Sequence, residues 1–207
     1  MDLDRAAVAT MLAAAATRMD EHADYLSEID SRFGDGDHGI TIRKLAKLIL
    51  TKLSDWEDAS IRDFLEELGA AAMEIKGGSA GPLYGTLLGG LGVQLGETEN
   101  ELDSDGVKRM FAGALAELED ITTARVGDKT MMDALIPAVA AAQAAEGPPA
   151  HVLRAAAAAA EAGAKASEGF VSKFGRARSY KEQTIGTPDA GAVSTALFIR
   201  GLADGVQ

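Results

Sequence analysis

The sequence predicts an all-α fold in a single domain that spans residues 1–207. Apolar residues recur three and four positions apart along most of the chain, which is the period of an amphipathic helix, whereas strand-like alternation is almost absent. Hydrophobic residues make up 47% of the 207 residues, which is enough for one closed core. Glycine-rich stretches separate the periodic segments, as expected for connections between helices.

Four helices are predicted in the first half of the chain, over about 3–27, 39–53 and 61–76 and from residue 82 onward. The first carries one long apolar stripe, made of Val8, Leu12, Ala15, Met19, His22, Leu26 and Ile29. Ser60 followed by Asp63 is a helix-start signature. Gly77 and Gly78 are expected to end the third helix, and Pro82 suits the first turn of the fourth.

Four more helices are predicted in the second half, from near residue 104, after residue 127, and over about 150–173 and 188–202. Asp128 is the expected N-cap of the sixth helix. Gly147, Pro148 and Pro149 form an ordinary turn, because three residues between two strong helices are too few for a domain linker. The chain is therefore assigned eight helices.

The glycine-rich stretches fall in one set of connections, at residues 34–39, 77–81, 127, 175 and 186–191. In a bundle whose helices run up and down, the connections that follow the first, third, fifth and seventh helices lie at the same end. These four connections are the ones that contain the glycine-rich stretches. The sequence therefore predicts a site at one end of the bundle.

Composition excludes several classes of protein. The net charge of −12 would repel a nucleic-acid backbone, and no cluster of Lys and Arg offsets it. The chain has no cysteine, so it has neither disulfides nor thiolate metal sites. Its apolar stretches are rich in alanine and interrupted by charge, so no membrane span is expected, and without a secretory signal the expected location is the cytoplasm.

An acidic loop joins the first two predicted helices in the stretch FGDGDHGIT. Asp30, Asp35 and Asp37 surround Gly34 and Gly36, which let the backbone turn sharply. Three carboxylates on one tight loop suit Mg²⁺, which shares a few carboxylates with substrate phosphates. The glutamate that an EF-hand needs at its twelfth position is missing. A solvated loop that only caps two helices is the alternative interpretation.

His38 follows the acidic residues directly. Two roles are open to it. It can contact a phosphoryl group, as a neutral donor or an imidazolium, or it can hydrogen-bond to Asp35 and orient that carboxylate without touching the ligand itself. His22, on the apolar stripe of the first helix, is expected to be a core histidine, and His151 is expected at the surface.

The other three glycine-rich connections offer further binding groups. In GGSAGPLYGT, the backbone N–H groups at a helix start and the Ser79 hydroxyl can hold a phosphate, although the stretch is not a Walker A loop. Gly127 and Met131 can flank a planar base, Arg176 can neutralise phosphate, and Asp189 can accept a hydrogen bond. Each residue also has a structural interpretation, as a turn, a core filler, a surface cation or a helix cap.

Asp30 with GDGDHG, together with GGSAGPLYGT, GDKTMMDALIPA and GRARSYKEQTIGTPDAGA, resembles the nucleotide-binding L subunit, or DhaL domain, of the dihydroxyacetone (glycerone) kinase family. Four motifs in the same order over nearly the whole chain make the resemblance specific. It implies a single DhaL-type domain folded as a closed barrel of eight antiparallel amphipathic helices, with ADP or ATP and two Mg²⁺ ions at one end.

The resemblance also implies roles for individual residues. Asp30, Asp35 and Asp37 would ligate the metal ions and, with His38, act at the catalytic centre. The implied nucleotide contacts are His38, Ser79, Ala80, Gly81, Gly127, Met131, Arg176 and Asp189. Ala80 replaces a serine that is common in the family, and residues 178–183 and Thr187 also depart from the usual pattern. These departures leave the nucleotide lid and the exact substrate open.

The implied activity is that of a phosphotransferase with an alcohol group as acceptor. A separate K subunit would hold dihydroxyacetone or a related small ketose on a histidine, and this chain would transfer the phosphoryl group through its Mg-nucleotide. A phosphohistidine protein of the phosphotransferase system is the favoured donor. An ATP-dependent kinase subunit for dihydroxyacetone or erythrulose and a non-catalytic ADP-binding regulator are the alternatives, and a homodimer is left open.

Overall fold

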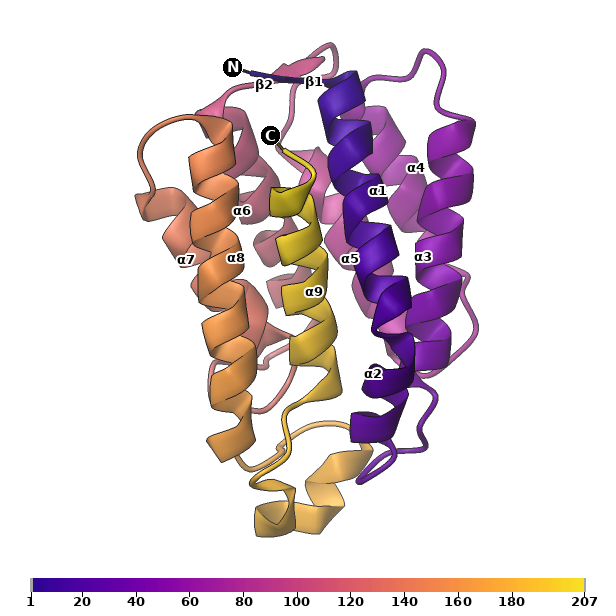
Figure 1. Ribbon diagram of the computed structural model, residues 1–207, viewed down its shortest axis with the longest axis vertical. Coiled ribbons are helices and arrows are strands. Elements are labelled where there is room, and N and C mark those ends of the chain that lie inside the picture. Colours follow the sequence, from indigo (N-terminus) through magenta and orange to yellow (C-terminus); the bar gives the residue numbers. More distant parts are fainter. Residues whose placement is uncertain (1, 207) are drawn as a thin grey trace.

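The computed structural model describes residues 2–206 and is built from helices, with one two-residue strand pair, which confirms the predicted all-α class (Figure 1). Its α-helices are α1 (Arg5–Glu21), α2 (Ala23–Asp30), α3 (His38–Ser54), α4 (Ile61–Met73), α5 (Ala80–Val93), α6 (Ser104–Ile121), α7 (Met132–Ala144), α8 (Pro149–Ala166) and α9 (Ala190–Asp204). Two 3₁₀ segments, η1 (Ser167–Gly169) and η2 (Arg176–Thr184), lie between α8 and α9. The strands β1 (Leu3–Asp4) and β2 (Glu101–Leu102) form a two-residue antiparallel pair.

Most predicted helices are present, but the first one is divided. The chain leaves helical geometry at His22, where φ is −102° and ψ is 5°, so that α1 and α2 follow one another. The second piece runs on to Asp30, three residues beyond the predicted end. The first candidate metal ligand is thus the last residue of a helix and not part of a loop.

Two other predicted boundaries were wrong. Asp128 does not cap the sixth helix, because its carboxylate accepts hydrogen bonds from the Arg125 N–H and from Lys173, and α7 begins only at Met132. The helix expected to run to residue 173 ends at Ala166. In both places a long polar connection replaces part of a helix, and this connection supplies side chains to the site.

The helices alternate in direction along the chain (Figure 1). Neighbours in sequence pack together from α4 to α9, while α9 packs on α1 and α1 packs on α3. The connections α2–α3, α4–α5, α6–α7 and α8–α9 therefore lie at one end, shown at the bottom of Figure 1, and the chain termini lie towards the other. Within the described residues, no helix has the length and apolarity needed to span a membrane.

Small residues let the helices approach closely. A Cβ atom added at Gly201 of α9 would lie 2.3 Å from the Cα atom of Ala15 on α1. A Cβ atom at Gly39 of α3 would lie 1.8 Å from the carbonyl oxygen of Ala23 on α2. The backbones therefore meet directly at these two contacts, and the second one holds the acidic loop between α2 and α3.

Gly201→Ala is expected to destabilise the protein by about 1–3 kcal/mol, because the added methyl group overlaps the α1 backbone. This penalty exceeds the roughly 1 kcal/mol that alanine gains over glycine inside a helix. Gly89→Ala is the matched control: it also lies inside a helix, but the nearest atom that its added methyl group would meet outside the adjoining backbone of its own helix is the Gly69 Cα atom, at 3.9 Å. Urea unfolding should show a loss of stability for the first variant and no loss for the second. Equal midpoints would contradict the close packing of α1 on α9.

Candidate functional site

A cavity of about 440 Å³ opens at the end of the bundle where the four glycine-rich connections meet. It is lined by residues from each connection, as predicted from the alternation of the helices. The predicted site residues in its wall are Asp30, Asp35, Asp37, His38, Ser79, Ala80, Met131, Arg176 and Asp189.

Two predicted contacts, Gly81 and Gly127, do not line the cavity. Gly81 lies against the end of α4, where an added Cβ atom would be 2.5 Å from the carbonyl oxygen of Ile75. Gly127 adopts a φ of 96° and donates its N–H to Asp133 over 2.6 Å. Both glycines shape the backbone behind the wall, a role that their sequence motifs could not distinguish from ligand contact.

The three carboxylates form a cluster at one side of the cavity. Asp30, Asp35 and Asp37 each present an oxygen within 4.8 Å of the others. The Gly34 N–H donates to the Asp30 carbonyl over 2.7 Å, and a Cβ atom at Gly34 would lie 2.3 Å from the Asp30 carboxylate. Gly36 follows with a φ of 74°, a conformation that favours glycine. The glycines are thus the reason that the loop can fold back on Asp30.

The charges within this cluster act on one another. Desolvation, followed by the charge of Asp35, raises the pKa of Asp37. Desolvation would also raise the pKa of Asp35, but the Arg176 guanidinium and hydrogen bonds outweigh it, and the pKa of Asp35 lies below its ordinary value. Arg176 forms an ion pair with Asp35, so its guanidinium already neutralises part of the negative charge.

The cluster fits a hard divalent cation. Its donors are all carboxylate oxygens, which Mg²⁺ prefers, and their mutual repulsion is relieved when a cation binds between them. The residues that would hold the ion are Asp30, Asp35 and Asp37.

Four helices begin at the cavity, and two of them, α3 and α5, start without a side-chain cap. Asp37 and Ser79 precede these helices, and neither side chain caps its helix with a hydrogen bond. At the start of α7, the Met132 N–H donates to the Thr130 hydroxyl over 3.2 Å and the Asp133 N–H donates to the Thr130 carbonyl over 3.0 Å. Asp189 caps α9 by accepting the Ala192 N–H over 2.7 Å. Helix N-termini with open N–H groups favour anions. The cavity thus offers carboxylates for cations on one side and backbone N–H groups for anions around it.

Sequence reasoning assigned no role to Lys129 and Asp133, although both lie in the motif GDKTMMD. The Lys129 ammonium is buried and donates to the carbonyls of Ser167 and Thr187 over 2.6 and 2.5 Å. Asp133 is fully buried and accepts the N–H groups of Gly127 and Thr130, each over 2.6 Å. The sequence feature that could have indicated a role for them is the presence of two charged residues beside an apolar helix. They hold the α6–α7 connection and both ends of the segment between α8 and α9.

Asp189 lies where these elements meet. Burial, together with the nearby charges of Asp133 and Asp30, raises its pKa to about 7, although the Ala192 N–H and Lys129 favour the charged form. Burial lowers the pKa of Lys129 as well, with Asp189 and Asp133 opposing the shift. The helix-cap interpretation of Asp189 is confirmed, and the residue also lines the cavity.

His38 does not orient Asp35, as one of its two predicted roles required. Its backbone N–H points at the Asp30 carboxylate over 3.4 Å, and its ring nitrogen Nε2 lies 2.9 Å from the Ser194 hydroxyl of α9. Burial lowers the pKa of His38, although the charge of Asp30 and a hydrogen bond with the Ala190 backbone oppose the shift. Tyr84 and Ser194, which sequence reasoning missed, form the polar group behind it.

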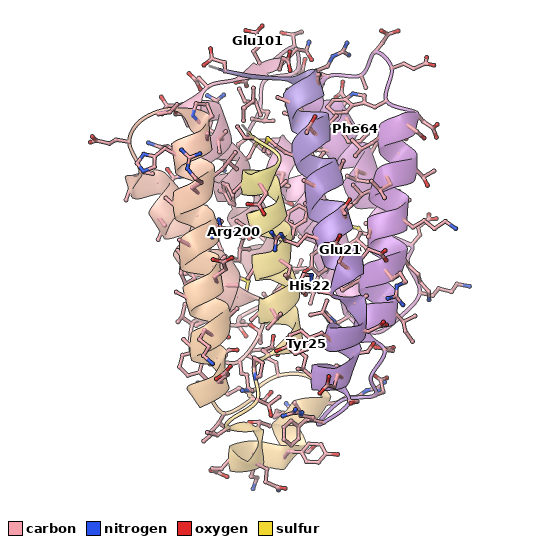
Figure 2. All side chains as sticks on the ribbon, viewed as in Figure 1. Glu21, His22, Tyr25, Phe64, Glu101 and Arg200 are labelled. Atoms are coloured by element: carbon pink, nitrogen blue, oxygen red, sulfur yellow. The ribbon has the colours of Figure 1, made fainter. Side chains whose placement is uncertain are left out.

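The other histidines lie outside the cavity wall. His22 is half-buried and contacts the Arg18 carbonyl through Nδ1, and Figure 2 shows it with Tyr25 on the flank of the bundle above the loop end. His151 is exposed, as predicted.

The η2 segment crosses the loop end of the bundle (Figure 1). Its first residues, Arg176 and Ala177, line the cavity. The Tyr180 ring packs on Phe33 with centroids 5.2 Å apart, and Arg32 reaches the Thr187 hydroxyl over 3.4 Å. Residues 170–187, here called the lid, therefore contact the acidic loop directly.

Comparison with known proteins agrees with the motifs. The DAK2 domain family matches residues 32–204. A D-erythrulose kinase of Mycolicibacterium smegmatis is 36% identical over 204 residues, which cover 95% of this chain and 35% of that protein. The ADP-binding subunit DhaL of the PEP-dependent dihydroxyacetone kinase of Escherichia coli is 28% identical over 206 residues and 98% of each chain.

Among solved structures, the dihydroxyacetone kinase of C. freundii in complex with AMP-PNP and Mg²⁺ superimposes with a TM-score of 0.74 at 26% identity. The match covers 99% of this chain and 34% of that one. The chain thus spans about a third of the erythrulose kinase and of the C. freundii enzyme, and nearly all of the DhaL subunit. The resemblance to L subunits is confirmed, and the chain belongs to the DAK2 domain family.

Proposed function

We propose that this chain is the nucleotide-binding part of a ketose kinase. It would hold ADP or ATP in the cavity at the loop end and transfer a phosphoryl group to dihydroxyacetone or a related small ketose. The observation that carries this proposal is the meeting of three carboxylates and two helix N-termini without a side-chain cap, those of α3 and α5, in one cavity. A relative named as an ADP-binding subunit and a similar structure with AMP-PNP and Mg²⁺ support it.

Asp30, Asp35 and Asp37 would hold two Mg²⁺ ions. Bound there, the metal would screen the phosphate charges and stabilise the transferring phosphoryl group. The open N–H groups at the start of α5, with the Ser79 hydroxyl, would take further phosphate oxygens. Met131 would lie against the base. Metal binding to Asp35 would break the ion pair between Asp35 and Arg176, and the Arg176 guanidinium would then be available to bind phosphate.

We propose that the helices close into the barrel of eight that the resemblance implies. If α1 and α2 count as one helix divided at His22, the described helices number eight. The packing of α9 on α1 and of α1 on α3 supports a closed ring.

The acceptor ketose would be held by a partner. The cavity wall contains one histidine, His38, and its ring is engaged with Ser194, so we assign covalent ketose binding to a separate K subunit.

The exposed large apolar side chains of the described residues gather around the loop end, which suits docking of the K subunit there. They are Tyr25, Ile40, Met73, Ile121, Val126, Tyr180 and Ile185, whereas Leu50 lies apart on α3.

Two phosphoryl donors are compatible with this site. A phosphohistidine protein of the phosphotransferase system, with ADP kept as a cofactor, is favoured by similarity to the PEP-dependent DhaL subunit over the full length of both chains. Free ATP is the other donor, and similarity to a D-erythrulose kinase, 36% identical, keeps erythrulose open as the acceptor. The intact carboxylates argue against a purely regulatory ADP-binding role. A homodimer stays open.

Asp35→Asn and Asp37→Asn are each expected to lower Mg²⁺-dependent ADP affinity by about a hundredfold or more, because they remove a ligand and a charge from the cluster. Isothermal titration with and without EDTA measures this, and circular dichroism checks that the helices persist. Asp105→Asn, an exposed residue in the first turn of α6, is the control and should leave affinity unchanged. Tight Mg-ADP binding by either of these two variants would refute the assignment of the aspartates as metal ligands.

The donor can be determined by adding a K subunit and dihydroxyacetone or erythrulose to the purified chain. If ADP is a resident cofactor, nucleotide released on denaturation is ADP that exchanges slowly, and product forms only with a phosphoenolpyruvate relay. If ATP is consumed, product forms with ATP alone. Absence of ketose phosphate under both conditions, with Mg-ADP still bound, would favour the regulatory alternative.

Ile40→Ser is expected to weaken binding to the K subunit by about tenfold, because an exposed apolar side chain at the loop end is removed from the interface. Leu50→Ser is the matched control, since it changes an equally apolar exposed side chain further along the same helix. Surface plasmon resonance compares the two. Equal affinities would place the partner elsewhere.

A further inference from the structure

The base of the lid is attached to two consecutive residues of the α6–α7 connection, Asp128 and Lys129. Lys129 Nζ donates to the Ser167 carbonyl just before the lid and to the Thr187 carbonyl at its end, over 2.6 and 2.5 Å. The Asp128 carbonyl accepts the Lys173 N–H over 3.1 Å, and the Asp128 carboxylate accepts from Lys173 Nζ over 2.6 Å. The α6–α7 connection therefore holds the lid segment at three points.

Lys129 occupies its place at a conformational cost. Its φ of 61° lies in the left-handed region, which residues other than glycine rarely adopt, and the residue is only 5% exposed. A buried amino group is tolerated only where its N–H groups find acceptors. The two carbonyls are those acceptors, and a substitution without N–H groups removes the hydrogen bonds that connect Ser167 to Thr187.

The tip of the lid, residues 175–183, is held much less firmly than the base. Its residues are mostly exposed. The tip contacts the acidic loop through Arg176, which pairs with Asp35, and through Tyr180, which packs on Phe33. The Arg176 and Tyr180 side chains are themselves exposed, and exposed ion pairs contribute little to stability. The position of the tip therefore depends on how the base is held.

The lid forms part of the cavity wall and crosses the loop end of the bundle (Figure 1). Its residues in that wall are Ser172, Phe174, Gly175, Arg176, Ala177 and Thr187. A molecule in the cavity is thus retained partly by the lid, and an open lid would leave one side of the site uncovered.

We infer that Lys129 is a positioning residue that holds the lid over the cavity through its hydrogen bonds to Ser167 and Thr187, and that it thereby sets how long a nucleotide stays bound. With both ends of the lid fixed to one buried group, Arg176 stays at the cavity wall. Without that group, the lid opens more often and the nucleotide leaves sooner. The hold on the lid stands independently of any activity, whereas its effect on nucleotide residence rests on the proposed function.

Hydrogen–deuterium exchange on the free chain measures how firmly the lid is held. The N–H groups of Ser172, Lys173 and Gly186 donate hydrogen bonds at its base, so they exchange when the lid opens. Lys129→Met keeps a long side chain but removes its N–H groups. Exchange in residues 170–187 is expected to become about tenfold faster, because two hydrogen bonds of a buried group are lost. Helices α1 and α5 should keep wild-type protection.

Lys165→Met is the matched control, because Lys165 is an exposed lysine near the end of α8 that pairs with Glu168 at the surface. Its lid should exchange as in the wild type. Wild-type exchange in Lys129→Met would overturn the inference. Faster exchange spread evenly over all helices would also overturn it, because the lysine would then stabilise the whole fold and not the lid. If Lys129→Met does not fold, Lys129→Gln gives the same test, since its shorter side chain keeps the site polar but does not reach both carbonyls.

Nucleotide release tests the consequence for binding. Fluorescently labelled Mg-ADP, displaced by excess unlabelled ADP in a stopped-flow instrument, is expected to dissociate about tenfold faster from Lys129→Met than from the wild type. Its association rate should stay within about threefold, because the carboxylates and the starts of α3 and α5 are unchanged. An unchanged dissociation rate would refute the role in nucleotide residence even if the lid exchanges faster. Wild-type protein that binds no Mg-ADP would instead refute the proposed function, and the exchange measurement would still decide whether Lys129 holds the lid.

Discussion

Repulsion among three carboxylates is the constraint on which this structure depends. Asp30, Asp35 and Asp37 bring their oxygens within 4.8 Å of one another in a chain that already has a net charge of −12. Such an arrangement persists only when the surrounding fold holds it and opposite charge compensates it. The protein supplies one guanidinium, from Arg176, and the positive ends of several helices. The remaining negative charge gives the site its preference for cations.

The scaffold meets this constraint through close backbone packing. Glycines at 34 and 39 let the acidic loop fold against α2, since a side chain at either would overlap Asp30 or Ala23. Lys129 ties together the two ends of the segment that carries Arg176. The cluster thus lies between the helices on one side and the lid on the other. Metal binding to the carboxylates would release Arg176 for other anions.

This arrangement gives a physical basis for the proposal that an acidic protein holds a polyanionic nucleotide. Cations between the carboxylates and N–H groups at the helix starts would together offset nucleotide phosphates, so no basic patch is needed. His38 lies between the two parts, with its backbone N–H towards Asp30 and its ring towards Ser194. The apolar side chains around the loop end suit a partner that brings the second substrate to this opening.

The sequence by itself determined the helical class, the alternation of helices and the end of the bundle that holds the site, because these follow from local periodicity and from the spacing of glycines. Nine of the eleven predicted site residues line the cavity; Gly81 and Gly127 do not, because a motif cannot tell backbone shaping from ligand contact. Only the tertiary structure decided the ion pair of Arg176 with Asp35, the buried Lys129 and the pairing of His38 with Ser194 and Tyr84. Those contacts join residues that are 38 to 156 positions apart, and no local pattern specifies which polar side chains meet across helices.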